Sequence, residues 1–222
     1  QPESSAASDV YKRQDKMVNQ TAYNSLRQHA PRLALALLFQ PERQKATLST
    51  LLLLGLEFDR IAAQVSEPML AMIRLQWWQD QLDTDNASAG PLAAHLKNQL
   101  LSGELTAEDV SSLLVCWRQS IELGMSDSAD NWAQLIYLMS VKAGLKRTDF
   151  AEEIGRSVAL SRAGQPVNVP SSDAIYAQAG KGSEFLICLA YLARQAAKRD
   201  VTRTPFLIFG LLYQVILRPT SR

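Results

Sequence analysis

The residues best suited to chemistry in this chain are carboxylates and an arginine on an otherwise apolar helix. Glu57, Asp59 and Arg60 interrupt the run LLLLGLEFDRIAA, whose apolar residues recur at spacings of three and four and so predict a helix. At about 100° per residue, Glu57 lies about 70° from the middle of the apolar stripe, so we expect its side chain to be partly buried. A buried carboxylate must be paired, protonated or bound to a cation, because an isolated charge is costly in a low dielectric.

Arg74 raises a similar question on the next predicted helix, within SEPMLAMIRLQWW at residues 66–78. It lies three and four residues before Trp77 and Trp78, so its guanidinium can stack on an indole. Stacking leaves five N–H donors that need a carboxylate, backbone carbonyls or a ligand phosphate. The residues alone allow two interpretations: a structural Glu57–Arg74 pair, and an Arg74 that binds a diphosphate.

Several other kinds of site have no support in the sequence. Neither His29 nor His95 has a Cys, Asp or Glu at metal-ligand spacing, and the chain has no P-loop, GxGxxG or GxSxG motif. Cys116 and Cys188 lie far apart and fit no disulfide framework or metal site, which predicts free thiols in a reducing compartment such as the cytoplasm. With 23 basic and 22 acidic residues, the formal net charge is +1, so we expect no nucleic-acid partner.

The elements that position these residues are predicted to be helices. Apolar residues make residues 41–64 a long central helix, and signals for strands or tight hairpins are scarce. Other helices are predicted over 21–39 with an interruption near Pro31, and over 67–83, 91–102, 106–123, 129–144, 148–161, 182–198 and 204–218, with a turn-rich loop at 84–91. At 222 residues and 47% hydrophobic composition, the chain fits one all-α domain.

The two ends of the sequence differ from the middle. QPESSAASDVYKRQ at residues 1–14 has no apolar periodicity, and its SAASDVYKRQ part resembles a translated adapter artefact. We therefore treat residues 1–19 as a non-native or disordered lead and residues 20–222 as the domain. Near the other end, FLIFGLLYQVIL at 206–217 is too short to span a bilayer and predicts a core helix, with a peripheral membrane contact as the alternative.

Residues 36–82 resemble the opening helices of the squalene/phytoene synthase family, and SEPMLAMIRLQWW most resembles its bacterial and mitochondrial complex I assembly factor-like branch. Further likenesses follow in the family's order at Tyr137 with Ala143-Gly144, Gly155-Arg156 with Val158 to Leu160, GQPVNVPSSD (164–173) and TPFLIFGLLYQVIL (204–217). The resemblance implies a single-domain isoprenoid synthase-like bundle with a central apolar cavity. It places Phe58, Trp77, Trp78 and Tyr137 on the cavity lining.

Active members of this family resemble one another in carrying two aspartate-rich motifs on facing helices, which hold Mg²⁺ ions around the diphosphate of a prenyl substrate. The resemblance makes Glu57 and Asp59 candidate metal ligands in the first motif. It makes Arg74 and Arg156 candidate diphosphate ligands. Two clusters of oxygen ligands have to converge on one cavity for this chemistry, because a single carboxylate seldom holds Mg²⁺ with a diphosphate in place.

The chain departs from that pattern in three places. Ala62-Ala63 replaces the carboxylate that the first motif needs one turn after Asp59. No Asp or Glu occurs between Glu153 and Asp173, where the second motif should precede GQPVNVP. Gln165 stands where the family has the arginine of its GRxYLP segment.

Two functions from different classes follow from the resemblance and these departures. In the first, the chain is a non-catalytic binding or complex I assembly-type module without a cofactor, peripheral to the inner membrane. Its partners would be a lipid, a prenyl diphosphate or a respiratory-complex subunit. In the second, it is a Mg-dependent prenyltransferase that condenses two prenyl diphosphates head to head. The carboxylate count favours the first, and an all-α protein of unrelated function is a third alternative.

Overall fold

The computed structural model describes residues 22–64, 67–83, 90–125, 128–180 and 182–197, together with positions 210, 212, 213 and 215. Every regular element within these ranges is a helix and none is a strand, which confirms the all-α fold class. Residues 22–29 form a first helical segment. The helices that follow are α2 (Pro31–Ala36), α3 (Glu42–Gln64), α4 (Pro68–Asp83), α5 (Pro91–Leu101), α6 (Ala107–Glu122), α7 (Ala129–Lys142), α8 (Ala151–Arg162), α9 (Ser172–Ala179) and α10 (Glu184–Ala197).

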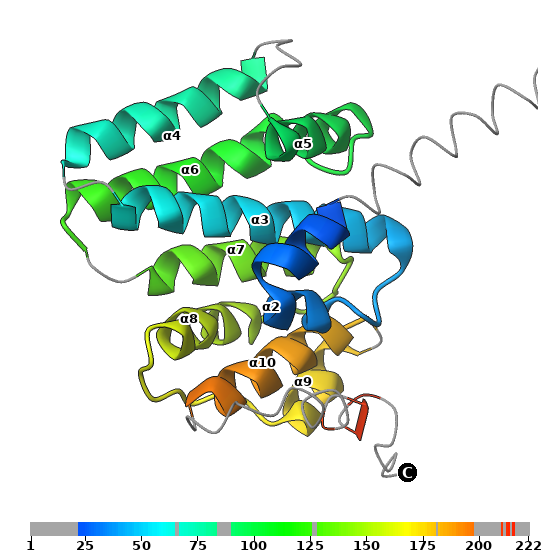
Figure 1. Cartoon of the computed structure of the whole chain (residues 1–222). Coiled ribbons are helices and arrows are strands. Elements are labelled where there is room, and N and C mark those ends of the chain that lie inside the picture. Colours follow the sequence, from blue (N-terminus) through cyan, green and yellow to red (C-terminus); the bar gives the residue numbers. More distant parts are fainter. Residues whose placement is uncertain are drawn as a thin grey trace, which may run out of the picture.

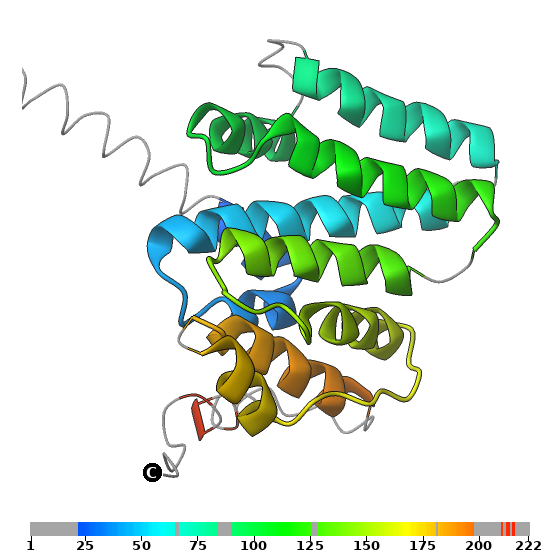
Figure 2. The same ribbon diagram turned by 180° about the vertical axis from the view of Figure 1, so that it is seen from behind.

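Helix α3 lies at the centre of the bundle, as the sequence predicts. It packs against α4, α5, α6 and α7, and Figures 1 and 2 show α4, α6, α3 and α7 stacked in that order, with α8, α9 and α10 beyond α7. Leu51, Leu52 and Leu54 project from different sides of α3 and are all fully buried. A helix that is apolar on most of its sides has to be surrounded by other elements.

The helix ends follow local sequence signals. Pro31 begins α2 at its first turn and so interrupts the first predicted helix as expected. The sequence reasoning missed α9, although Ser171 accepts a hydrogen bond from the Ala174 backbone N–H at 3.2 Å and Gly180 ends the helix with a φ of 70°. The signal was present, but eight residues are too few to show apolar periodicity.

Several predictions concern residues outside those that the structure describes. The lead at residues 1–19 and most of the loop at 84–91 are among them. Of the segment 206–217, only four positions are described, so the proposed membrane contact stays a prediction. Within the described part of the chain, no helix combines the length and apolar character needed to cross a bilayer.

The two cysteines are free thiols, as predicted. Cys188 is buried on α10, and this burial raises its thiol pKa to about 12. Burial also raises the thiol pKa of Cys116, which is half-buried on α6. Both side chains therefore act as small apolar residues and not as nucleophiles.

Helices α7 and α8 come very close to each other at Gly155. A Cβ added to Gly155 would clash with the carbonyl oxygen of Trp132 and lie 2.7 Å from Ala133 Cα. Both atoms belong to the backbone of α7, which cannot move away by a change of rotamer as a side chain can. At Gly55 on α3, an added Cβ would instead lie 2.5 Å from Leu135 Cδ2, the end of a flexible side chain. Gly155 thus sets the distance between two backbones, whereas Gly55 shapes a side-chain contact.

We expect Gly155→Ala to lower the free energy of unfolding by more than about 2 kcal/mol, because α8 must move away from α7. This loss occurs although alanine is favoured over glycine in a helix by about 1 kcal/mol. Gly55→Ala is the matched control, and we expect it to stay within about 1 kcal/mol of the wild type because Leu135 can change rotamer. Urea denaturation measures both variants, and equal effects would show that α7 and α8 are not in backbone contact.

Candidate functional site

Asp59 on α3 joins four helices through its carboxylate. The indole Nε1–H of Trp117 on α6 donates to Oδ1 at 3.1 Å, and that of Trp132 on α7 donates to Oδ2 at 2.7 Å. The guanidinium of Arg162, the last residue of α8, donates to Oδ2 at 3.0 Å and stacks over the Trp132 ring, 4.6 Å from its centroid. Both oxygens of Asp59 are therefore used by protein donors, and its charge is matched by Arg162.

A hollow of about 430 Å³ lies beside this carboxylate. Its wall includes Asp59, Ala62, Ala63 and Arg162, together with Ser120 and Asn131, which hydrogen-bond to each other at 2.9 Å. The wall thus presents one carboxylate, already bound, and one guanidinium. The side chains of Ala62 and Ala63 supply no ligand atoms to this hollow, where the resemblance predicts a further carboxylate.

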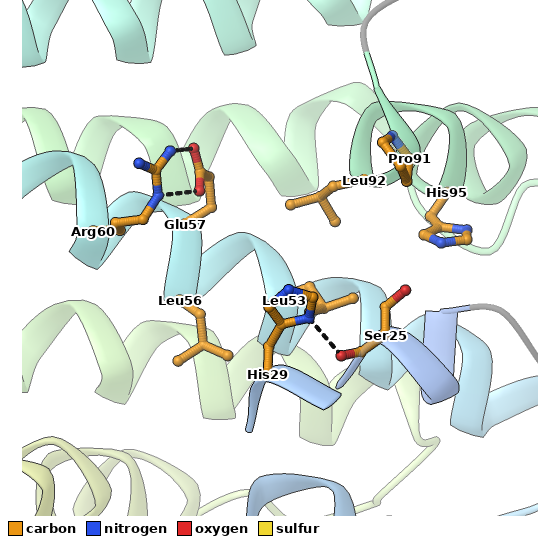
Figure 3. A pocket seen from close by; sticks show the side chains of 9 residues that line it. All are labelled: Ser25, His29, Leu53, Leu56, Glu57, Arg60, Pro91, Leu92 and His95. Carbon is orange, nitrogen blue, oxygen red and sulfur yellow. Dashed lines mark hydrogen bonds and ion pairs between the residues drawn. The ribbon is translucent and has the colours of Figure 1, made fainter. Parts of the chain in front are cut away.

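Glu57 faces away from Asp59. Residues two apart on a helix are about 200° apart around its axis, so these carboxylates point to opposite sides of α3. Glu57 accepts two hydrogen bonds from Arg60, one turn later, at 2.5 and 2.8 Å (Figure 3). It borders a different hollow from the one at Asp59. The two candidate metal ligands are therefore not brought together. Among the described residues, no three His, Cys, Asp or Glu side chains cluster as a metal site would require.

The candidate diphosphate ligands also lie apart. Arg74 is exposed on α4 and makes no hydrogen bond or ion pair with any residue that the structure describes. The Glu57–Arg74 pair, one of the two interpretations of the sequence, is wrong, because Glu57 forms its ion pair with Arg60 on the same helix. Arg156 is exposed on α8, where its guanidinium binds Asp130 at 2.9 Å and Glu152 at 3.5 Å. Neither arginine borders the hollow at Asp59.

Of the four aromatic residues predicted to line a cavity, two are buried and two are exposed. Phe58 and Trp78 are buried and pack edge to face, with ring centroids 6.0 Å apart. Phe58 also packs against Trp117 in the same way, at 5.5 Å. Trp77 and Tyr137 are exposed. The rings of Phe58, Trp78 and Trp117 fill the space between α3, α4 and α6, and none of the four predicted residues lines the hollow at Asp59.

Two further hollows flank α3. One, of about 530 Å³, lies between residues 22–29, α3 and α5, and it contains Glu57, Arg60 and His95 (Figure 3). The other, of about 480 Å³, is lined mainly by apolar residues of α2, α8 and α10 and by Arg162. They share Leu56 and His29 as walls. All three hollows include residues from the C-terminal half of α3 in their lining.

His95, which the sequence analysis considered only as a metal ligand, is a buried polar residue of α5. Its side chain is only 6% exposed, and neither ring nitrogen has a hydrogen-bond partner among the described residues. This burial lowers the pKa of the imidazole below its usual value. The sequence around a single histidine on a helix does not indicate which groups it contacts. The burial, hydrogen bonding and protonation of His95 could therefore not be predicted from the sequence alone.

The squalene/phytoene synthase family model matches residues 26–137, which is half of the chain. The chain belongs to the squalene/phytoene synthase family. A search of the curated proteins and a search of the solved structures found no match. The matched range contains Glu57, Asp59, Arg74 and both indoles that bind Asp59, and it ends before α8.

Membership of the squalene/phytoene synthase family agrees with the helical architecture, since its fold is the all-α isoprenoid synthase fold. It also identifies the kind of chemistry in the family, which is prenyl transfer. Family membership does not by itself identify catalytic residues in this chain. The oxygens of Asp59, the candidate ligand from the first acidic motif, bind two indoles and a guanidinium.

We expect Asp59→Asn to lower the free energy of unfolding by about 2 to 3 kcal/mol. An amide has one acceptor oxygen and would aim an N–H₂ group at an indole or at Arg162. Glu57→Gln, two residues earlier on the same helix, is the control and should cost less than about 0.5 kcal/mol, because its ion pair is a partly exposed i,i+3 contact. Thermal and urea unfolding measure both, and equally small losses would mean that Asp59 does not anchor the bundle.

We expect His95 to make the folded protein less stable as the pH falls. Its folded pKa is lowered, so below the unfolded value of about 6.5 the unfolded chain binds a proton that the folded chain does not. The loss is at most about 1.4 kcal/mol per pH unit and continues down to the folded pKa. His95→Phe should flatten urea stability between pH 7.5 and 5.5, with the exposed His29→Phe as control. Equal slopes in wild type and His95→Phe would show that His95 is not held neutral.

Proposed function

We propose that this member of the squalene/phytoene synthase family is a non-catalytic binding module of the complex I assembly type. The observation that supports the proposal is the set of donors on Asp59. Its carboxylate is neutralised by Arg162 and hydrogen-bonded by Trp117 and Trp132. In a prenyltransferase of this family, the corresponding acidic residue would have to be available to a metal ion.

The position of Arg162 strengthens this argument. The resemblance places the second acidic motif immediately before GQPVNVP, and α8 ends just there with Arg162. The helix that the resemblance expects to carry the second group of carboxylates therefore ends in a cationic residue, Arg162. Two unit positive charges 4 Å apart repel by about 4 kcal/mol at an effective dielectric of 20, and a divalent ion would double this.

The residues present do not fit a Mg²⁺–diphosphate site. One carboxylate is occupied by protein donors, Glu57 points to the other side of α3, and the described residues hold no cluster of three metal-ligating side chains. Mg²⁺ needs several oxygen ligands in near-octahedral geometry. Family membership is therefore the observation in favour of the prenyltransferase alternative, and the arrangement of these side chains argues against it.

Two surfaces support a binding role. The hollow of about 480 Å³ between α2, α8 and α10 is lined mainly by apolar residues, with His29, Arg32, Ser161 and Arg162 as its polar members, which suits a lipid or prenyl compound that carries a polar head group. On α4, the large apolar side chains Met69, Leu70, Ile73 and Trp77 are exposed on one face, and exposed apolar patches of this kind mark contacts with other proteins. We propose a respiratory-complex subunit as this partner and the cytoplasmic side of the inner membrane as the location, both from the family branch that SEPMLAMIRLQWW resembles.

Pyrophosphate release tests the proposal. Purified protein is incubated with farnesyl or geranylgeranyl diphosphate over a range of Mg²⁺ concentrations, and we expect no release above the protein-free control. Any Mg-dependent release would contradict the proposal. If Glu57→Gln abolished that release, Glu57 would be a catalytic group. This variant is suitable because Glu57 makes only a local ion pair, so the loss would not arise from unfolding.

A further inference from the structure

The hollow that contains His95 has a chemistry of its own. It lies between residues 22–29, α3 and α5, shares no lining residue with the hollow at Asp59, and its lining side chains are drawn in Figure 3. Leu53, Leu56, Pro91 and Leu92 give it mainly apolar walls. Its volume of about 530 Å³ falls within the range of about 300–1,000 Å³ that is common for small-molecule sites.

His95 borders this hollow and has unused hydrogen-bonding capacity. The imidazole lines the space, yet both of its nitrogens are shielded from solvent and have no partner among the described residues. The His95 atoms that face the hollow are therefore carbon atoms. A half-turn of the ring exchanges Nδ1 with Cδ2 and Nε2 with Cε1, and it breaks no existing hydrogen bond. A ligand that offers a partner can thus recover an interaction that the protein leaves unmade.

The charges around the hollow favour a neutral ligand. Glu57 and Arg60 form a bidentate pair with each other, so they cancel at one side of the space. His95 is held neutral by its burial, and a neutral imidazole has one donor and one acceptor nitrogen. A hydroxyl group can donate to one ring nitrogen or accept from the other, and so it matches either tautomer.

We propose that this hollow binds a neutral molecule with an apolar body and a terminal hydroxyl group that hydrogen-bonds to His95. The apolar body packs on the leucine and proline side chains of α3 and α5. The site is separate from the one at Asp59 and does not depend on whether the domain is catalytic.

Three probes of equal chain length test the preference for a neutral head group: 1-octanol, octanoate and octylammonium. Isothermal titration calorimetry on the full chain is expected to show saturable binding of 1-octanol, with both charged probes at least tenfold weaker. In a histidine-labelled sample, the ring nitrogen resonances of His95 should shift on addition of 1-octanol. Absence of saturable 1-octanol binding, or tighter binding of either charged probe, would overturn the proposal.

Variants locate the site. Leu92→Trp fills the hollow from α5 and is expected to abolish 1-octanol binding, whereas Leu101→Trp, on the same helix but 76% exposed, is expected to leave it unchanged. His95→Phe should weaken binding about tenfold, and His95→Gln, which keeps a donor and an acceptor, should retain most of it. Melting curves confirm that each variant is folded. Unchanged affinity in Leu92→Trp, or equal affinity in wild type and His95→Phe, would refute the assignment.

Discussion

The carboxylate of Asp59 is the interaction on which the rest of the bundle depends. Trp117 and Trp132 are fully buried, so their indole N–H groups need an acceptor inside the protein. One carboxylate serves both, and Arg162 neutralises the charge that this acceptor brings into the core. Helices α3, α6, α7 and α8 are thereby tied at a single point. A hydrogen-bond network inside a protein stabilises the structure only when each polar group in it has a partner. Here the carboxylate, both indole N–H groups and the guanidinium are all paired.

Helix geometry explains why the remaining acidic residues do not form one site. Glu57 and Asp59 are two positions apart, so α3 directs them to opposite sides, where one meets Arg60 and the other meets Arg162. Each carboxylate has its own cation. The chain therefore keeps the packing of a prenyl-synthase fold while its charges are neutralised within the protein. Fold and catalytic competence are separate properties, and family membership establishes the first of them.

The sequence predicted the parts of the structure that depend on local patterns. Apolar periodicity located α3, and the resemblance carried by SEPMLAMIRLQWW led to the correct family. Side-chain partners were harder to foresee, because Asp59 and Arg162 are 103 residues apart and no periodicity relates them. Arg74 drew attention because it lies in an apolar segment, yet it faces outward. The arginine that matters lies at the end of α8, where the sequence reasoning looked only for missing carboxylates.

The contact between α7 and α8 accounts for how Arg162 reaches Asp59. Gly155 and Arg162 are seven residues apart, which is close to two helical turns, so they share one face of α8. Because Gly155 lies against the backbone of Trp132 and Ala133, that face is held next to α7. Arg162 is then placed over the Trp132 ring and within reach of Asp59 Oδ2. The ion pair between Arg162 and Asp59 is thus supported by a close helix contact two turns away. Introducing acidic residues near the end of α8 would leave the contact at Gly155, and the alignment of α8 on α7, in place.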